Sequence, residues 1–139
     1  MKKATLALAS LFALATLPAQ AVESAKVYTP MEIFVKSCES LQKTWALNTK
    51  TTKAVTSGTE NIMNGHCYNI LTTTTQLVEM GKDAVAFKDI CIPDNAKNVQ
   101  ILNSVMPNLK DVMKQGSWEE ITPAFGLVVA LEIAYPCKG

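Results

Sequence analysis

Four cysteines constrain the fold of this chain more than any other feature of its sequence. They are Cys38, Cys67, Cys91 and Cys137. They follow an N-terminal segment with a basic start, a short apolar run and a small-residue cleavage site at Ala19-Gln20-Ala21, the three parts of an export signal. An even number of cysteines in an exported chain of this size indicates two disulfides. We therefore expect residues 1–21 to be a signal peptide and residues 22–139 to form one domain.

The composition of residues 22–139 excludes several classes of function. This part has eleven lysines and twelve acidic residues, so its net charge is about −1, and it has no arginine. Arginine makes the bidentate contacts to phosphates and bases, so its absence disfavours nucleic-acid binding and phosphoryl transfer. No apolar stretch after the signal is long enough to span a bilayer, and no cysteine stands at the cleavage site. We expect a soluble periplasmic protein without membrane contact after cleavage.

Capping boxes predict where the first two helices begin. Thr29-Pro30-Met31-Glu32 opens a helix that should end near Asn48, and Ser57-Gly58-Thr59-Glu60 opens one that should end at Gly81. Apolar residues three and four positions apart predict the buried face of each helix. These residues are Met31, Phe34, Cys38, Leu41 and Trp45 in the first, and Met63, Cys67, Ile70, Thr74 and Leu77 in the second. Residues 48–57 between them are expected to form an exposed loop.

Two further helices are expected in the second half of the chain. The third should begin at Pro93-Asp94 and end at Gln115-Gly116, and its apolar stripe stays in phase across Pro107, which favours a kink over a break. That stripe consists of Val99, Leu102, Met106, Leu109 and Met113. The fourth, residues 124–135, is apolar almost all round and should be central and buried. The sequence therefore predicts a compact all-α bundle of four to five helices held by two disulfides.

The expected helix positions rank the three connectivities that four cysteines allow. Cys38 lies about ten residues before the first loop and Cys67 about ten after it. If these helices are antiparallel neighbours, both sulfurs lie roughly 15 Å from that connection. Cys91 precedes the third helix and Cys137 follows the fourth, which places both at one end of a four-helix bundle. We favour the pairs Cys38–Cys67 and Cys91–Cys137.

Catalysis is disfavoured by the residues that the chain lacks. His66 is the only histidine, and it stands beside Cys67. A Cys-His pair is typical of thiol catalysis, but adjacent helical residues point about 100° apart and this cysteine is expected to be oxidised. A zinc site needs three or four ligands, which one histidine and bonded sulfurs cannot supply. We expect a binding protein with no cofactor and no metal, not an enzyme.

The second half of the chain follows a layout found in a known family. Its parts are Cys91-Ile92-Pro93, a helix with Gln100, Ser117-Trp118-Glu119-Glu120-Ile121, Ala130-Leu131, and Tyr135-Pro136-Cys137. This layout resembles the Rap/Tai immunity proteins of type VI secretion, and Gly65-His66-Cys67 resembles that family's Gly-x-Cys. The two Cys-Pro corners are the specific part of the likeness. Gln115-Gly116 stand where the family has His-Pro.

The resemblance implies a function and a partner. Members of that family are small helical periplasmic proteins, often homodimers, that neutralise peptidoglycan amidases injected by neighbouring cells. It therefore implies that this chain inhibits a cognate secreted amidase, and that it can form a homodimer.

We expect the corner at residues 114–120 to block the amidase cleft. Trp118 would be a buried anchor, and Glu119 and Glu120 would meet a basic cleft. The alternative is that Trp118 packs on the bundle and the two acids cap a helix. The candidate partner-binding residues are Lys114, Gln115, Ser117, Trp118, Glu119 and Glu120. The loop at residues 48–57 is a second candidate surface.

A different class of function is also compatible with the residues. In a periplasmic chaperone of the small helical acid-stress type, Met63, Met80, Met106 and Met113 would provide adaptable apolar contacts. Methionines at helical spacing also suit a core, and two disulfides would hinder opening. Suppression of client aggregation near pH 3 but not near pH 7 would support this alternative. An enzyme would have to lose activity when His66 is replaced.

Overall fold

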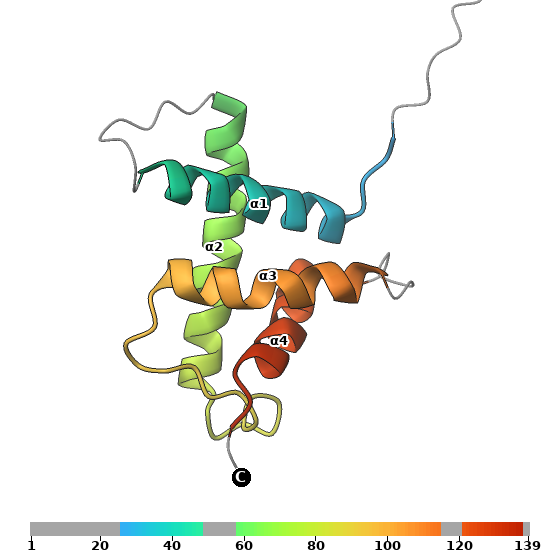
Figure 1. Cartoon of the computed structure of the whole chain (residues 1–139). Helices are drawn as coiled ribbons and strands as arrows, with labels where there is room; N and C mark the ends of the chain where they lie inside the picture. Colours follow the sequence, from blue (N-terminus) through green and yellow to red (C-terminus); the bar gives the residue numbers. More distant parts are fainter. Residues whose placement is uncertain (1–25, 49–57, 115–120, 138–139) are drawn as a thin grey trace, which may run out of the picture.

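The computed structural model describes residues 26–48, 58–114 and 121–137, and this part of the chain is all-α. Four helices follow one another: α1 (Pro30–Asn48), α2 (Gly58–Met80), α3 (Asn98–Lys114) and α4 (Pro123–Ala134) (Figure 1). The predicted fold class is confirmed. None of these helices is long and apolar enough to cross a membrane. The predicted signal peptide lies outside the described residues.

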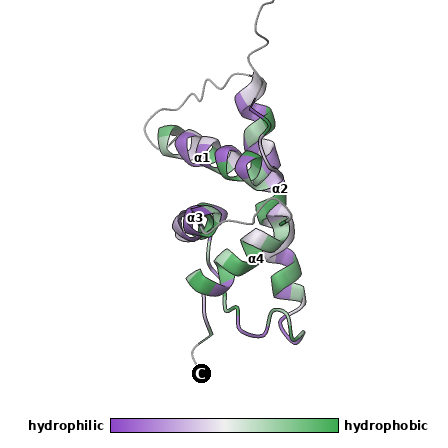
Figure 2. Ribbon diagram, turned by 90° about the vertical axis from the view of Figure 1, so that its right-hand side faces the viewer, coloured by the Kyte–Doolittle hydropathy of each residue, from purple (hydrophilic) through white to green (hydrophobic). Residues whose placement is uncertain are grey.

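The four helices form two layers. α1 and α3 lie side by side and run in opposite directions, and α2 and α4 lie behind them (Figure 1). The view turned by 90° shows α1 and α3 on one side of the molecule and α2 and α4 on the other (Figure 2). The hydrophobic core lies between the layers, where Phe34 of α1, Leu102 of α3 and Leu131 of α4 are fully buried.

Both predicted disulfides are present. Cys38 and Cys67 join α1 to α2 with their Cα atoms 5.0 Å apart, and Cys91 and Cys137 are joined with a Cα–Cα distance of 4.9 Å. The first bond lies where α1 crosses α2 at a steep angle (Figure 1). The pairing is therefore as predicted, although the two helices are not the antiparallel neighbours on which that prediction rested.

The capping box that opens α1 is confirmed. The Thr29 backbone N–H donates to Glu32 Oε2 at 2.9 Å, and the Glu32 N–H donates to Thr29 Oγ1 at 3.2 Å. These two bonds satisfy backbone donors that a helix cannot satisfy internally at its first turn. The buried face of α1 is also as predicted, since Met31 and Phe34 have no exposed surface and Leu41 is almost fully buried.

The buried face of α2 differs from the predicted stripe. Leu77 is half exposed, whereas Leu71, Thr75 and Val78 are buried. The Thr75 hydroxyl donates to the Leu71 carbonyl at 2.9 Å, so this buried polar group is satisfied by its own helix. The buried face of α2 is therefore rotated slightly from the face that the apolar spacing predicts.

α3 begins later than predicted. It starts at Asn98 and not at Pro93-Asp94, because Gln100 Oε1 accepts the Lys97 N–H at 2.9 Å and caps the helix there. The preceding residues form a turn in which the Ala96 N–H donates to the Pro93 carbonyl. From Asn98 the helix continues through Pro107 to Lys114, as the unbroken apolar stripe predicted.

α4 is buried on one face alone, so the prediction of a central and buried helix is wrong. Thr122 caps its first turn by accepting the Phe125 N–H at 3.3 Å. Leu127 and Leu131 are fully buried, but Phe125 is 57% exposed and Ile133 is 56% exposed. Both lie in a helix that is apolar along most of its length (Figure 2). With four helices in two layers, α4 forms an outer edge of the bundle.

Candidate partner-binding surface

Of the six predicted partner-binding residues, Lys114 lies in the described part of the structure. It is the last residue of α3, and its Nζ lies 2.9 Å from Asp111 Oδ1. Both side chains are largely exposed, and a cation at the end of a helix interacts favourably with the helix dipole. Gln115, Ser117, Trp118, Glu119 and Glu120 lie outside the described residues, as do residues 49–57 of the second candidate surface.

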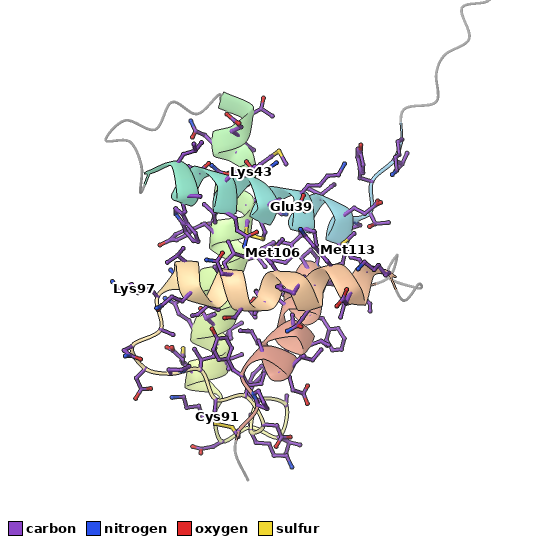
Figure 3. All side chains as sticks on the ribbon, viewed as in Figure 1. Glu39, Lys43, Cys91, Lys97, Met106 and Met113 are labelled. Carbon is purple, nitrogen blue, oxygen red and sulfur yellow. A yellow bond between two sulfur atoms is a disulfide. The ribbon has the colours of Figure 1, made fainter. Side chains whose placement is uncertain are left out.

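Lys114 lines a groove between α1 and α3, which we call the α1–α3 groove. Its volume is about 380 Å³, and it is open to solvent. Its lining residues are Glu32, Val35, Lys36, Glu39, Lys110, Met113 and Lys114. In Figure 3 the Met113 side chain lies between the two helices, below Glu39. The structure thus connects the predicted binding corner to a surface that the sequence did not indicate.

The groove has an apolar floor and a rim that carries both signs of charge. Val35 is buried and Met113 is half-buried, and together they provide the floor. Across the groove, Lys110 Nζ of α3 lies 2.8 Å from Glu39 Oε1 of α1. Both side chains are substantially exposed, so this ion pair stabilises the fold by about 1 kcal/mol at most. Its charges remain accessible to a partner.

Tyr28, just before the first residue of α1, lies beside Lys36, one of the residues that line the groove. Lys36 Nζ lies 3.6 Å from the centroid of the Tyr28 ring, and Lys26 Nζ lies 5.3 Å from it. A hydrogen bond from Lys36, and then the positive charge of Lys36, lower the pKa of Tyr28 from its ordinary value. An aromatic ring with two ammonium groups near it can contact both apolar and acidic groups of a partner.

The chain on both sides of the predicted corner is attached to the core. α3 places Leu109 and Val112 in the core just before Lys114, and α4 begins at Pro123 just after the corner. At Gly126 a Cβ atom would lie 2.7 Å from Met31 Cε, so glycine allows α4 to approach α1 closely. The helices on either side of residues 115–120, α3 and α4, are therefore both anchored in the core.

His66, which precedes Cys67 in the chain, contacts the core through its ring. It is exposed on α2, and its ring meets the buried Phe34 ring edge-on at a centroid distance of 6.4 Å. The neighbouring Cys67 is bonded to Cys38, so no thiolate lies beside the imidazole. Within the described ranges, no three His, Cys, Asp or Glu side chains come together in a way that could hold a metal ion.

The comparisons with known proteins give no match: no family model, no curated protein and no solved structure is similar to this chain. The likeness to the Rap/Tai immunity proteins therefore rests on the residues of the Cys-Pro corners.

Proposed function

We propose that this protein is a periplasmic immunity protein that binds a secreted peptidoglycan amidase and blocks its active-site cleft. The observation that carries the proposal is that the helices on either side of the predicted corner, α3 ending at Lys114 and α4 beginning at Pro123, are both packed in the core. Leu109 precedes the segment and Leu127 follows it, and both are fully buried. An inhibitor that fills a cleft benefits from rigid helices beside its inserted segment, because a pre-ordered scaffold loses less conformational entropy when it binds.

The two disulfides support the same conclusion. Cys38–Cys67 ties the two layers together at the crossing of α1 and α2, and Cys91–Cys137 ties the end of α4 to the segment before α3. The second bond restricts the end of α4, one of the two helices beside the predicted corner, and the first restricts α1 and α2 on which the bundle packs. Disulfides also persist in oxidising compartments, which agrees with the export signal expected at residues 1–21.

The α1–α3 groove offers a second contact next to the corner. Its apolar floor can accept an apolar side chain of the partner, and its charged rim can exclude water around that contact. Lys114 belongs both to the groove and to the corner. A partner that engages the corner would therefore reach the groove without any rearrangement of the described helices.

The chaperone alternative draws less support from the structure. Met106 is 2% exposed and belongs to the core, and Met113 is half-buried against it, whereas Met80 is 85% exposed. One exposed methionine is a small adaptable surface. The buried Cys38–Cys67 bond would also restrict the opening that such a chaperone needs.

The proposal is tested with oxidised protein comprising residues 22–139 and the secreted amidase encoded beside its gene. Isothermal titration calorimetry should give a dissociation constant in the nanomolar range. Release of peptidoglycan fragments should stop at stoichiometric inhibitor. Trp118→Ala should weaken binding by on the order of 100-fold, as expected for a central aromatic anchor. Lys97→Ala, at the opposite end of α3, is the matched control and should bind as the unchanged protein does.

Two results would contradict the proposal. One is a protein that neither binds the amidase nor slows it. The other is suppression of client aggregation near pH 3 but not near pH 7, which would favour the chaperone. If Trp118→Ala binds the amidase as tightly as the unchanged protein, Trp118 is not the anchor, although the protein is still an inhibitor. The α1–α3 groove would then be the next surface to test.

A further inference from the structure

The two disulfides differ sharply in their access to solvent. Cys38 and Cys67 have no exposed surface. Cys91 is exposed and Cys137 is half-buried. Figure 3 shows the Cys91 bond at the end of the molecule farthest from α1. A sulfur atom reacts with a thiolate only when the thiolate can approach it along the S–S axis, so access separates the two bonds chemically.

We propose that Cys91–Cys137 is a thiol-exchange site, open to reversible reduction by an external dithiol while Cys38–Cys67 stays oxidised. The reductant is a small dithiol or a protein with two exposed cysteine thiols. The inference does not depend on the amidase, since it rests on the accessibility of the two bonds.

The reaction balances in two steps. A thiolate of the external dithiol attacks one sulfur of the Cys91–Cys137 bond, forms a mixed disulfide and releases the other cysteine as a thiolate, which takes up a proton. The second thiol of the reductant loses its proton and attacks the mixed disulfide, which frees the remaining cysteine. The protein gains two electrons and two protons, and the reductant leaves as a disulfide.

The backbone around the bond keeps the two cysteines together after reduction. The Cys91 N–H donates to the Tyr135 carbonyl at 2.8 Å, and the Cys137 N–H donates to the Asp89 carbonyl at 3.0 Å. These two hydrogen bonds make an antiparallel bridge between Ile90 and Pro136. They do not involve the sulfur atoms, so the thiols remain neighbours and the bond can close again.

The core also holds this corner without the covalent bond. Ile90 is 3% exposed and Ile92 is 6% exposed, so both sides of Cys91 are anchored by buried side chains. Leu131 anchors the last turn of α4 in the same core. Reduction of Cys91–Cys137 therefore removes a covalent link from the end of α4 while the two-layer bundle persists.

The chain is well suited to measuring the two bonds separately. It lacks arginine, and cleavage after lysine puts the four cysteines on four different peptides. Oxidised protein in native buffer is treated with dithiothreitol, sampled over time, alkylated with iodoacetamide, digested and analysed by mass spectrometry. We expect Cys91 and Cys137 to be alkylated on the order of 100-fold faster than Cys38 and Cys67, because the buried bond reacts only after the structure opens.

Three further measurements complete the test. In about 6 M guanidinium chloride, which unfolds the domain and exposes both bonds, the two bonds should be reduced at similar rates. The Cys91→Ala/Cys137→Ala variant should retain a reduction-resistant Cys38–Cys67 bond, and the Cys38→Ala/Cys67→Ala variant should retain a reactive outer bond. Protein reduced at the outer bond should keep its helical circular dichroism and re-form Cys91–Cys137 when glutathione disulfide is added.

The inference fails if native protein loses both bonds at the same rate, or loses Cys38–Cys67 first. It also fails if reduction of the outer bond unfolds the helices, or if the separated thiols do not pair again. Each of these results can occur whether or not the protein inhibits an amidase, so they leave the proposed function untouched.

Discussion

Replacing Cys38 and Cys67 together with alanine should destabilise the protein more than the same replacement at Cys91 and Cys137. The expectation is not obvious from the lengths of chain that the bonds enclose. The first bond spans a sequence separation of 29 residues and the second a separation of 46. The longer loop loses more entropy in the unfolded state when it is closed, so chain entropy alone ranks the outer bond as the more stabilising.

Burial reverses that order. Loop-closure entropy gives about 3.6 kcal/mol for the inner bond and about 4.0 kcal/mol for the outer one. The inner sulfurs are fully buried, so alanine at Cys38 and Cys67 also leaves a cavity. That cavity costs about 1–2 kcal/mol more. Cys91 is exposed, and its replacement leaves no void. The inner pair should therefore cost about 5 kcal/mol and the outer pair about 4 kcal/mol.

Urea unfolding followed by circular dichroism measures both free energies. In the Cys91→Ala/Cys137→Ala background, reducing the remaining bond removes the cross-link but keeps its sulfur atoms, so this step measures the cross-link alone. The further loss when Cys38 and Cys67 are also replaced by alanine gives the cavity contribution. If the outer pair costs as much as the inner pair or more, the argument from burial is refuted.

Three further predictions concern the helix contacts and the surface around α1. Gly126→Ala places a methyl group against Met31 and should cost about 1–2 kcal/mol in urea unfolding, net of its better helix propensity. The cost of Gly126→Ala should be smaller in a Met31→Ala background. If the costs of the two replacements simply add, a direct contact between these positions is contradicted. Thr29→Ala should cost about 1 kcal/mol in thermal unfolding, whereas Thr29→Ser should cost little; equal losses would contradict the cap. Lys36→Gln should raise the pKa of Tyr28 toward its ordinary value in a titration of the ring signals by nuclear magnetic resonance, because Lys36 favours the ionised phenol; an unchanged titration would exclude that cause.

The helix boundaries that short sequence signals predict are largely confirmed. Thr29 and Glu32 form the expected capping box, and α2 ends at Met80, directly before Gly81. A Cβ atom at position 81 would lie 2.6 Å from the Phe87 ring, so glycine is needed there for the chain to turn back closely. Capping boxes and glycine caps depend on residues within a few positions of one another, so they can be recognised in the sequence alone.

The faces of the helices were harder to predict because they depend on the angle between partners. The apolar spacing of α2 marks Leu77 as inward, yet Leu77 is half exposed and Val78 is buried instead. Composition alone suggested a buried α4, but a four-helix bundle in two layers has no central position for it. Phe125 is left half exposed as a result.

The candidate surface was predictable in part. Lys114 follows from the sequence as a residue of the corner between α3 and α4. The α1–α3 groove could not be predicted from the sequence, because Glu39 and Lys110 are far apart in the chain. Taken one at a time, each is an ordinary solvent-exposed charge. Their proximity appears once the antiparallel packing of α1 and α3 is known.

The connectivity of the disulfides has a consequence for how the chain is oxidised. In chain order the first cysteine pairs with the second and the third with the fourth. A chain delivered N-terminus first to an oxidising catalyst presents Cys38 and Cys67 before Cys91 has emerged. Joining each cysteine to the next one that arrives then produces the native bonds directly, with no misplaced bond for an isomerase to correct.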